Sequence, residues 1–392
     1  MSNVDRWLLP DGIDEVLPER AHLVERMRRE ILDLYHKWGY DLVIPPMVEF
    51  TESLLSGSGK DLDLMTFRLT DQLSGRLMGV RADITPQVAR MDAHSLNLNC
   101  PGRFCYAGTV LHTRPRGPLE SRSPISVGVE LFGEPSVSAD IEIIELFLNT
   151  LSIVDIGDIY LDLGHVDIVR GLISEAQLST DLETEIFELL QRKAGTELAI
   201  WISENIQDKR LSQWLNNLPQ LAGSIEVLET AKMVLDGAPE IVTNAINQLE
   251  KIVESLDTSN LNIYLDLSEM PGYHYHTGAV FAAYIQGYGK ALGNGGRYDH
   301  VGEAFGRARP ATGFAFDLKA LVSQSPLSEG KSLGIFAPFC SDPLRHEEVK
   351  SLRSAGFRVV EGFKNQVVDY LELKCDRELV KVDDKYVVQS LS

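Results

Sequence analysis

Apolar residues recur with two different periods along this chain. A repeat of three to four residues is typical of an amphipathic helix, whereas strict alternation is typical of a half-buried strand. Both periods occur before residue 165. The stretches with helical spacing are residues 18–38, 83–95 and 138–154. The strand-like stretches are residues 40–46, 103–112, 124–133 and 159–164, together with a predicted hairpin over 65–83.

The pattern changes after residue 164. From about residue 165 to residue 256 helical spacing dominates and almost no strand signal is present, which predicts a helical insertion. Strand patterns return at residues 261–268, 278–287 and 290–298. Antiparallel strand runs combined with helices, without regular βαβ alternation, predict an α+β fold.

A small α/β C-terminal domain is predicted over residues 331–392, after a first domain over residues 1–325. The small domain contains equal numbers of basic and acidic residues, so it is not a basic nucleic-acid-binding module. Its expected elements are strands at 334–339 and 357–362, a helix around 343–356, a second short helix, and a strand pair at 378–382 and 385–390.

Composition and charge exclude several classes of protein. Acidic residues outnumber basic ones by 57 to 37, a formal charge of −20. Because proteins bind a phosphate backbone with Lys and Arg, this balance argues against extensive contact with nucleic acid. No apolar run approaches the roughly 18 residues of a membrane span, and the N-terminus lacks a signal-peptide pattern. The four cysteines form no CxxC pair, so we expect a cytoplasmic protein without a disulfide framework.

The strand predicted at 124–132 has two unlike faces. Alternation places the aliphatic residues at the odd positions on one face, and Ser126, Gly128 and Glu130 on the other. A hydroxyl and an acid flanking a glycine suit a ligand cavity, because glycine lets a ligand approach the backbone. The same pattern also suits a face exposed to water, and this segment alone favours that interpretation.

Two further segments carry polar residues with more than one interpretation. Asp83 and Thr85 lie where the helix 83–95 begins, so they suit either an ammonium site or a helix cap, and capping is the commoner role. Residues 293–299, GNGGRYD, match no phosphate-binding motif and predict a tight turn between strands, with Arg297 and Tyr298 pointing inward.

Two histidines, His274 and His276, alternate with tyrosines in GYHYHTGAVF, residues 272–281. Side chains two positions apart on a strand share a face, so a metal site is one hypothesis. A catalytic zinc needs a third protein ligand, and the sequence contains no HExxH motif. No GxSxG nucleophile elbow supports a hydrolase. A structural or pocket-lining role is therefore favoured, and no metal is assigned.

The order of the motifs resembles histidyl-tRNA synthetase and its paralogues, which have the class II aminoacyl-tRNA synthetase fold. The resemblance covers about residues 5–325. It rests on LPDG, GYDLVIPPMVE, GVRADIT, YAGTVLH, VGVELFG, YHYHTGAVF, GGRYD and ATGFAF in that order. It implies an antiparallel sheet with flanking helices and a histidine-binding site. The residues at the family's histidine-binding positions are Asp83, Thr85, Ser126, Glu130, Tyr275, His276 and Tyr298.

The resemblance also implies a role for each of these residues. Asp83 stands at the acid for the substrate ammonium, and Glu130 at the acid that faces the imidazole. Tyr275 and His276 occupy a two-tyrosine position. Ser126 replaces a glutamine near the carboxylate of the ligand.

The cations that catalyse adenylate formation in this family are missing here. The residues at the family's nucleotide- and carboxylate-binding positions are Leu111 and His112, Arg114, Glu120, Ala320 and Pro271. Arginines are expected at four of these positions, and Arg114 replaces a glutamate. Adenylate formation depends on cations aimed at developing negative charge, and each lost donor costs about a hundredfold to a thousandfold in rate. We therefore expect no synthetase activity.

A retained histidine site without catalytic cations resembles one paralogous family, the regulatory subunits of short-form ATP phosphoribosyltransferase (HisZ). That resemblance implies a non-catalytic subunit that activates the catalytic subunit HisG and mediates feedback inhibition by histidine in the first step of histidine biosynthesis. It implies a hetero-octamer in which magnesium and the chemistry belong to HisG, so this chain has no cofactor. It also implies a HisZ dimer formed through residues 18–38 and 40–46. An active histidyl-tRNA synthetase-like enzyme is the alternative.

Overall fold

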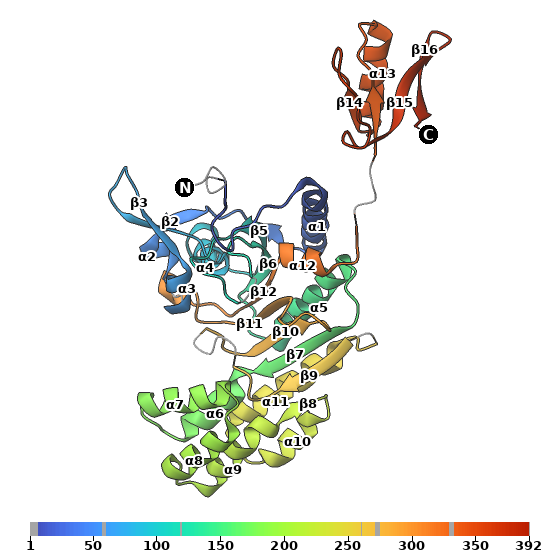
Figure 1. The fold of residues 1–392 in the computed structure, drawn as a ribbon. Helices are drawn as coiled ribbons and strands as arrows, with labels where there is room; N and C mark the ends of the chain where they lie inside the picture. Colours follow the sequence, from blue (N-terminus) through green and yellow to red (C-terminus); the bar gives the residue numbers. More distant parts are fainter. Residues whose placement is uncertain are drawn as a thin grey trace. The chain divides into compact units, whose positions relative to one another are not determined.

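The computed structural model describes residues 7–56, 60–117, 120–259, 261–270, 275–328 and 333–391. The chain divides into two compact units, Met1–Leu327 and Ser328–Ser392, which are described separately (Figure 1). Among the described residues, no helix combines the length and apolar character needed to cross a membrane.

A nine-stranded sheet in the order β1-β5-β6-β12-β11-β10-β7-β9-β8 forms the centre of the first unit. Neighbouring strands are antiparallel except for the parallel pairs β1–β5 and β7–β9. Of the strand predicted over 40–46, only two residues remain as β1. The strands are β1 (Asp41–Leu42), β5 (Gly102–Thr109), β6 (Ile125–Phe132), β7 (Ile159–His165), β8 (Ala222–Gly223), β9 (Leu261–Asp266), β10 (Ala279–Tyr284), β11 (Gly293–Arg297) and β12 (Ala311–Asp317).

One face of this sheet packs against the main hydrophobic core. Three of the helices that contribute to that core are α1 (Pro18–Lys37), α5 (Val137–Ile153) and α12 (Leu318–Gln324). The ring of Phe147 in α5 stacks on Phe316 at a centroid distance of 4.6 Å and meets Phe281 and Phe314 edge-on. One buried aromatic residue thus joins α5 to β10 and β12. The helices predicted at 18–38 and 138–154 are confirmed.

The opposite face is covered near β5 by α4 (Thr85–Arg90) and the π-helical turn η2 (Met91–Leu96). Ile84 and Val88 are buried there against Phe104 and Tyr106, and Pro86 occupies the first turn as predicted. A separate three-stranded sheet contains the predicted hairpin. Its strands are β2 (Val48–Phe50), β4 (Leu77–Val80) and β3 (Phe67–Thr70), accompanied by helices α2 (Thr51–Leu54) and α3 (Lys60–Met65).

The helical insertion is present beside β7 and β9 in Figure 1. One part of the prediction is wrong, because β8 lies inside this region and pairs with β9. A strand of two residues is too short to produce an alternating pattern. The helices are α6 (Val166–Glu175), α7 (Thr180–Gln191), α8 (Gly195–Asn205), α9 (Lys209–Asn217), α10 (Val227–Val234) and α11 (Glu240–Ser255), with a 3-10 turn, η3, at Leu218–Gln220.

The second unit is a four-stranded sheet in the order β14-β13-β15-β16 with one helix, α13 (Pro343–Ser354). The strands are β13 (Gly334–Ala337), β14 (Val359–Glu361), β15 (Cys375–Val382) and β16 (Lys385–Ser390). The second short helix predicted here is wrong, because the described residues between β14 and β15 form turns. Three apolar side chains of that segment, Phe363, Val367 and Leu371, are 78–94% exposed, so no packing stabilises a helix.

A buried ion pair joins β11 to α5. Nε of Arg297 donates to both carboxylate oxygens of Asp140 at 3.1 Å, and the two residues are 5% and 2% exposed. The strand pattern at 290–298 is confirmed and the tight turn predicted at 293–299 is wrong, because residues 293–297 form a strand in the middle of the sheet. Glycine permits this close pairing, since a Cβ added at Gly295 would lie 2.4 Å from the carbonyl oxygen of Gly313.

Replacement of Arg297 by methionine is expected to lower the free energy of unfolding by about 3–5 kcal/mol, because Asp140 would be left as an uncompensated buried charge. Urea denaturation measures the change. The exposed Arg192→Met variant is the control and should stay within about 0.5 kcal/mol of wild type. The double variant Asp140→Leu/Arg297→Met should recover part of the loss. An Arg297→Met protein as stable as the control would contradict this account of the pair.

Candidate functional site

A floor of small residues crosses the centre of the large sheet on the face opposite α5. Cross-strand pairing puts Gly128 of β6 beside Ala315 of β12, and Glu130 beside Gly313. A Cβ added at Gly128 would lie 2.2 Å from the carbonyl oxygen of Phe314. One added at Gly313 would lie 2.1 Å from Oε2 of Glu130. Glycine at these two positions therefore leaves room for polar side chains above the sheet.

The carboxyl group of Glu130 lies on this floor and is 1% exposed. The hydroxyl of Thr85 donates to Oε1 at 2.6 Å, and the hydroxyl of Tyr106 donates to the same oxygen at 3.1 Å. The hydroxyl of Tyr298 donates to Oε2. The interpretation of this strand face as exposed to water is therefore wrong. Three hydroxyls from separate segments replace water around the carboxyl group.

Burial raises the pKa of Glu130 well above its ordinary value, and the negative charge of Asp83 adds to this effect. The hydrogen bonds from Thr85 and Tyr106 act in the opposite direction. Burial also raises the pKa of Tyr106 and Tyr275, so both phenols keep their protons. A ligand that brings a positive charge or a proton donor would stabilise the ionised form of Glu130.

Asp83 fits both roles that the sequence left open. Its Oδ1 accepts hydrogen bonds from the backbone N–H groups of Ile84 at 2.6 Å and Thr85 at 3.1 Å, which caps the start of α4. Its Oδ2 has no hydrogen-bond partner among the described residues. Thr85 caps nothing, because its hydroxyl is directed to Glu130.

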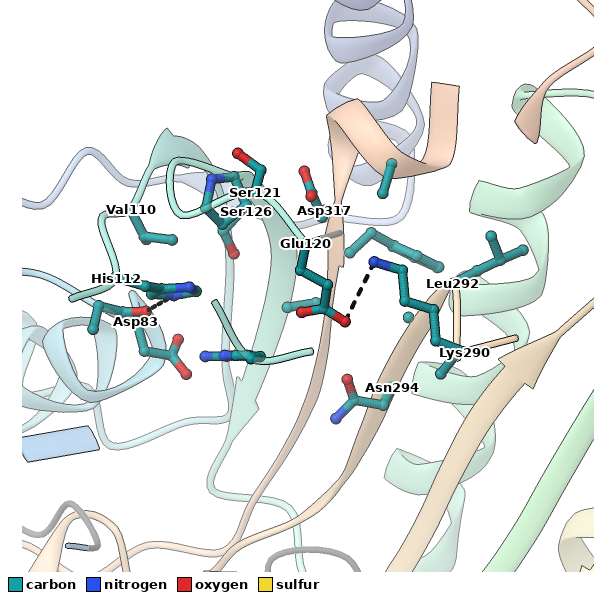
Figure 2. Close-up of a pocket in the computed structure, with 18 of the residues that line it drawn as sticks. Asp83, Val110, His112, Glu120, Ser121, Ser126, Lys290, Leu292, Asn294 and Asp317 are labelled. Atoms are coloured by element: carbon teal, nitrogen blue, oxygen red, sulfur yellow. Dashed lines mark hydrogen bonds and ion pairs between the residues drawn. The ribbon is translucent and has the colours of Figure 1, made fainter. Parts of the chain in front are cut away.

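A cavity of about 280 Å³ lies next to Asp83, and Ser126 also lines it. Figure 2 shows Asp83 and His112 on one side of this cavity and Lys290 on the other. Nζ of Lys290 forms an ion pair with Oε1 of Glu120 at 3.3 Å. Asp83 and Ser126 are the two residues of the predicted site that line the cavity. The others belong to the hydroxyl cluster around Glu130 or to the segment 275–276.

The segment 275–276 contacts this cluster from the side of β11. The ring of Tyr275 stacks on Tyr298 with centroids 5.0 Å apart. His276 is buried, and its Nδ1 lies 3.2 Å from the carbonyl oxygen of Arg297. Burial lowers the pKa of His276 to about 4, so the ring is neutral at pH 7. Pro271 and His274 lie outside the described residues.

The described residues contain no group of three or more His, Cys, Asp or Glu side chains placed to hold a metal ion. Nδ1 of His276 faces a backbone carbonyl oxygen instead. A neutral imidazole nitrogen that contacts a carbonyl oxygen is a donor, so it does not bind a metal in this geometry.

Several functional candidates were missed from the sequence. Tyr106 was not singled out, although a tyrosine inside an otherwise apolar strand is a usable signal for a buried hydroxyl. Arg116 and Lys290 line the cavity from loops, where no periodicity marks them, and Asn294 lines it from the start of β11. Ala320 and Glu120 also line it, in positions where the family has arginines.

The fold and the arrangement of this site define a class II synthetase-like protein. The family model of histidyl-tRNA synthetase matches residues 12–321. A crystal structure from Bacillus halodurans, an ATP phosphoribosyltransferase regulatory subunit/histidyl-tRNA synthetase, is similar with a TM-score of 0.82 and 26% identity, covering 95% of this chain and 97% of that chain. Histidyl-tRNA synthetase from a Nostoc species has a TM-score of 0.77 at 19% identity, covering 95% and 91%, and supports the fold. The expected class II fold is confirmed.

The C-terminal unit and the full-length relatives identify the family within the class II synthetase-like proteins. Residues 331–389 match the family model of the ATP phosphoribosyltransferase subunit HisZ C-terminal domain. The ATP phosphoribosyltransferase regulatory subunit of Teredinibacter turnerae is 50% identical over 394 residues, covering 100% of both chains. That of Saccharophagus degradans is 51% identical over 391 residues, covering 99% of both. The chain belongs to the family of ATP phosphoribosyltransferase regulatory subunits.

His276 should make the stability of the protein depend on pH. Its folded pKa, about 4, lies below the ordinary value of 6.5, so the unfolded state binds one proton more between these values. Stability from this group is therefore complete above pH 6.5 and is lost as the pH falls toward 4. Between pH 7 and pH 4.5 wild type should lose about 2–3 kcal/mol more than His276→Gln in urea denaturation.

The exposed His300→Gln variant is the control for this measurement and should follow wild type at both pH values. If His276→Gln and wild type lose the same stability on acidification, the ring of His276 is not held neutral by burial.

Proposed function

We propose that this chain is the non-catalytic regulatory subunit of a short-form ATP phosphoribosyltransferase. In this proposal it binds the catalytic subunit HisG, raises its activity and transmits feedback inhibition by histidine. The observation that carries the proposal has two parts. The hydroxyl cluster around Glu130 is complete, and the neighbouring cavity lacks the cations expected in a synthetase. Magnesium and the phosphoribosyl transfer belong to the partner, and no cofactor is assigned to this chain.

The cavity supports the non-catalytic part of the proposal. A nucleotide triphosphate needs several cations aimed at its oxygens. Lys290 is neutralised by Glu120, and Ala320 offers no charge. Asp83 and Asp317 add two further carboxyl groups to the same cavity. Repulsion between these acids and the phosphates disfavours adenylate formation.

Histidine is the proposed effector. Glu130 offers an acceptor for an imidazole N–H, and Tyr275 stacked on Tyr298 gives an aromatic wall beside it. Asp83, Thr85, Ser126 and His276 complete the proposed site. Feedback then requires histidine to bind one state of the complex more tightly than another, with a coupling free energy of about 1–3 kcal/mol.

Dimerisation of this chain is proposed through α1 and β1. Strand β1 pairs with β5 on one side, at the edge of the nine-stranded order. Leu42 and Ile44, at this edge, are 51% and 84% exposed. A second copy of the chain would bury these side chains, and an uncovered sheet edge favours such pairing.

Co-expression with a short-form catalytic subunit tests the central proposal. The two chains should co-purify, and turnover of the catalytic subunit should rise several-fold over that of the subunit alone. Light scattering should give the mass of a hetero-octamer, with a dimer for this chain by itself. Separate elution with unchanged turnover would reject the proposal. Histidine-dependent exchange of pyrophosphate into ATP by this chain alone would favour the synthetase alternative instead.

Glu130→Gln is expected to weaken histidine binding about ten- to a hundredfold, because a charge-assisted hydrogen bond to the imidazole is lost. Isothermal titration calorimetry of the full-length chain at pH 7.5 measures it. Glu188→Gln, on the exposed side of α7, is the matched control and should bind like wild type. Equal affinities for wild type and Glu130→Gln would remove this residue from the site.

A further inference from the structure

The sheet face that carries the Glu130 cluster continues beyond the cavity, over strands β10, β7 and β9, which lie side by side in Figure 1. Pairing in register connects Glu130 of β6, across β12, β11 and β10, to Gly164 of β7. Asp162, two residues before Gly164, therefore points to the same side of the sheet. The residues on either side of Asp162, Leu161 and Leu163, belong to the main hydrophobic core on the opposite side.

Three tyrosines lie around Asp162 on this face. Tyr160 precedes it by two residues on β7, and Tyr264 pairs with it from β9. Tyr284 of β10 pairs with Tyr160, and burial together with the negative charge of Asp162 raises the pKa of Tyr284. Tyr160 and Tyr264 are 44% and 42% exposed. None of the three phenol hydroxyls has a hydrogen-bond partner among the described residues. We call Tyr160, Asp162, Tyr264 and Tyr284 together the tyrosine face.

The carboxyl group of Asp162 is unpaired. It forms no hydrogen bond or ion pair with any residue that the structure describes. Burial raises its pKa to about 6, and the negative charges of Glu269 and Asp266 add to this effect. The nearby ammonium group of Lys193 pairs with Asp266 at 2.5 Å and lies 3.9 Å from Glu269. Three carboxyl groups of this region thus share one ammonium group, and it pairs with an acid other than Asp162.

The unpaired charge of Asp162 destabilises the free chain. Like charges repel at short range, and a half-buried carboxylate without a donor loses hydration without compensation. A cation brought to Asp162 from outside would remove the repulsion and supply the missing donor. The tyrosine face therefore complements a positively charged group, and the formal charge of −20 attracts such a partner over a longer range.

The chemistry of the tyrosine face favours an arginine of a partner protein over other occupants. A guanidinium group stacks on aromatic rings and donates two parallel hydrogen bonds to one carboxylate, whereas an ammonium group acts as a point charge. Tyrosine and arginine are also enriched at the centres of protein interfaces. A small free cation would stay largely in water on such an open surface. A second copy of the chain placed face to face would bring the same unpaired acid.

We propose that the tyrosine face binds an arginine-bearing surface of the catalytic subunit, with one guanidinium group stacked on the tyrosine rings and paired with Asp162. This inference rests on the proposed function and assigns a surface to it. Ala282 of β10 pairs with Asp162 on one side and with Asn294 of β11 on the other. Asn294 lines the cavity. A partner on the tyrosine face therefore borders the proposed effector cavity, and this shared border provides a physical route for coupling between the two binding events.

The affinity of the full-length chain for a short-form catalytic subunit, measured by biolayer interferometry, tests the inference. Asp162→Asn keeps the shape of the side chain and removes its charge, so it should weaken binding at least about tenfold. Tyr264→Ala should weaken binding about ten- to a hundredfold, because an aromatic anchor is lost. Tyr264→Phe keeps the ring and should stay within about twofold of wild type.

Two variants outside the tyrosine face are the controls. Glu204→Gln removes an exposed carboxylate from α8, and Phe363→Ala removes a 78% exposed ring from the second unit. Both should bind the catalytic subunit within about twofold of wild type. In urea denaturation, Asp162→Asn should be at least as stable as wild type, because its repulsion with Glu269 is removed. Unfolding would then not explain its weaker binding.

Photo-cross-linking identifies the group that meets the tyrosine face. Benzoylphenylalanine at position 264 should capture a segment of the catalytic subunit that carries an exposed arginine, identified by mass spectrometry. The same side chain at position 363 should capture no segment of that subunit. A captured segment without arginine would reject the guanidinium contact.

The outcomes that would overturn the inference can be distinguished. If Asp162→Asn and Tyr264→Ala bind the catalytic subunit as tightly as wild type, the inference fails while the proposed function stands. If those affinities are unchanged and spermidine binds wild type but not Asp162→Asn, the face is a small-cation site. If they are unchanged and Tyr264→Ala turns a dimer of this chain into a monomer, the face joins two copies. If wild type does not bind the catalytic subunit, both the inference and the proposed function fail.

Discussion

A carboxyl group buried above the centre of a β-sheet is the constraint on which the site depends. Glu130 has almost no access to water, so its oxygens need donors from the protein. Thr85, Tyr106 and Tyr298 supply them from α4, β5 and the residue after β11. These three segments meet above the sheet because positions 128 and 313 are glycines, which have no side chain to fill that space. The polar cluster therefore fixes the position of α4, and with it the position of Asp83.

One face of the sheet packs into the hydrophobic core and stabilises the fold, and the other face carries the proposed binding site. Adjacent residues of a strand point to opposite faces, so Arg297 enters the core to meet Asp140 while Tyr298 reaches Glu130. The core face carries Phe147 and its aromatic neighbours, and its loss would unfold the unit. The site face carries small residues and titratable groups whose pKa values are shifted by burial. Substitution on the site face can therefore change ligand binding without removing the aromatic core.

Local periodicity predicted the helices, most strands and the face that carries Ser126, Gly128 and Glu130. Exposure of that face was predicted wrongly, because Tyr298 and Glu130 are 168 residues apart and no local pattern reports the contact. The sequence of β11 gave two conflicting predictions, a strand over 290–298 and a tight turn over 293–299, because glycine in a strand centre reflects tight cross-strand packing rather than local backbone preference. The order of the motifs predicted the family, because the motifs mark positions that lie close together in the folded protein.

In the proposed function, loss of adenylation and retention of histidine binding have the same electrostatic origin. An adenylating site must concentrate positive charge, which would repel the ammonium group of a free amino acid unless acids balance it. In this chain, Lys290 is neutralised by Glu120. A triphosphate in this cavity would meet the carboxyl groups of Asp83, Glu120 and Asp317. The cavity is formed by the segment before α4, the loop after β5 and the strands β11 and β12. A ligand held between these elements couples their positions, which is the physical requirement for a subunit that reports an amino acid to a partner.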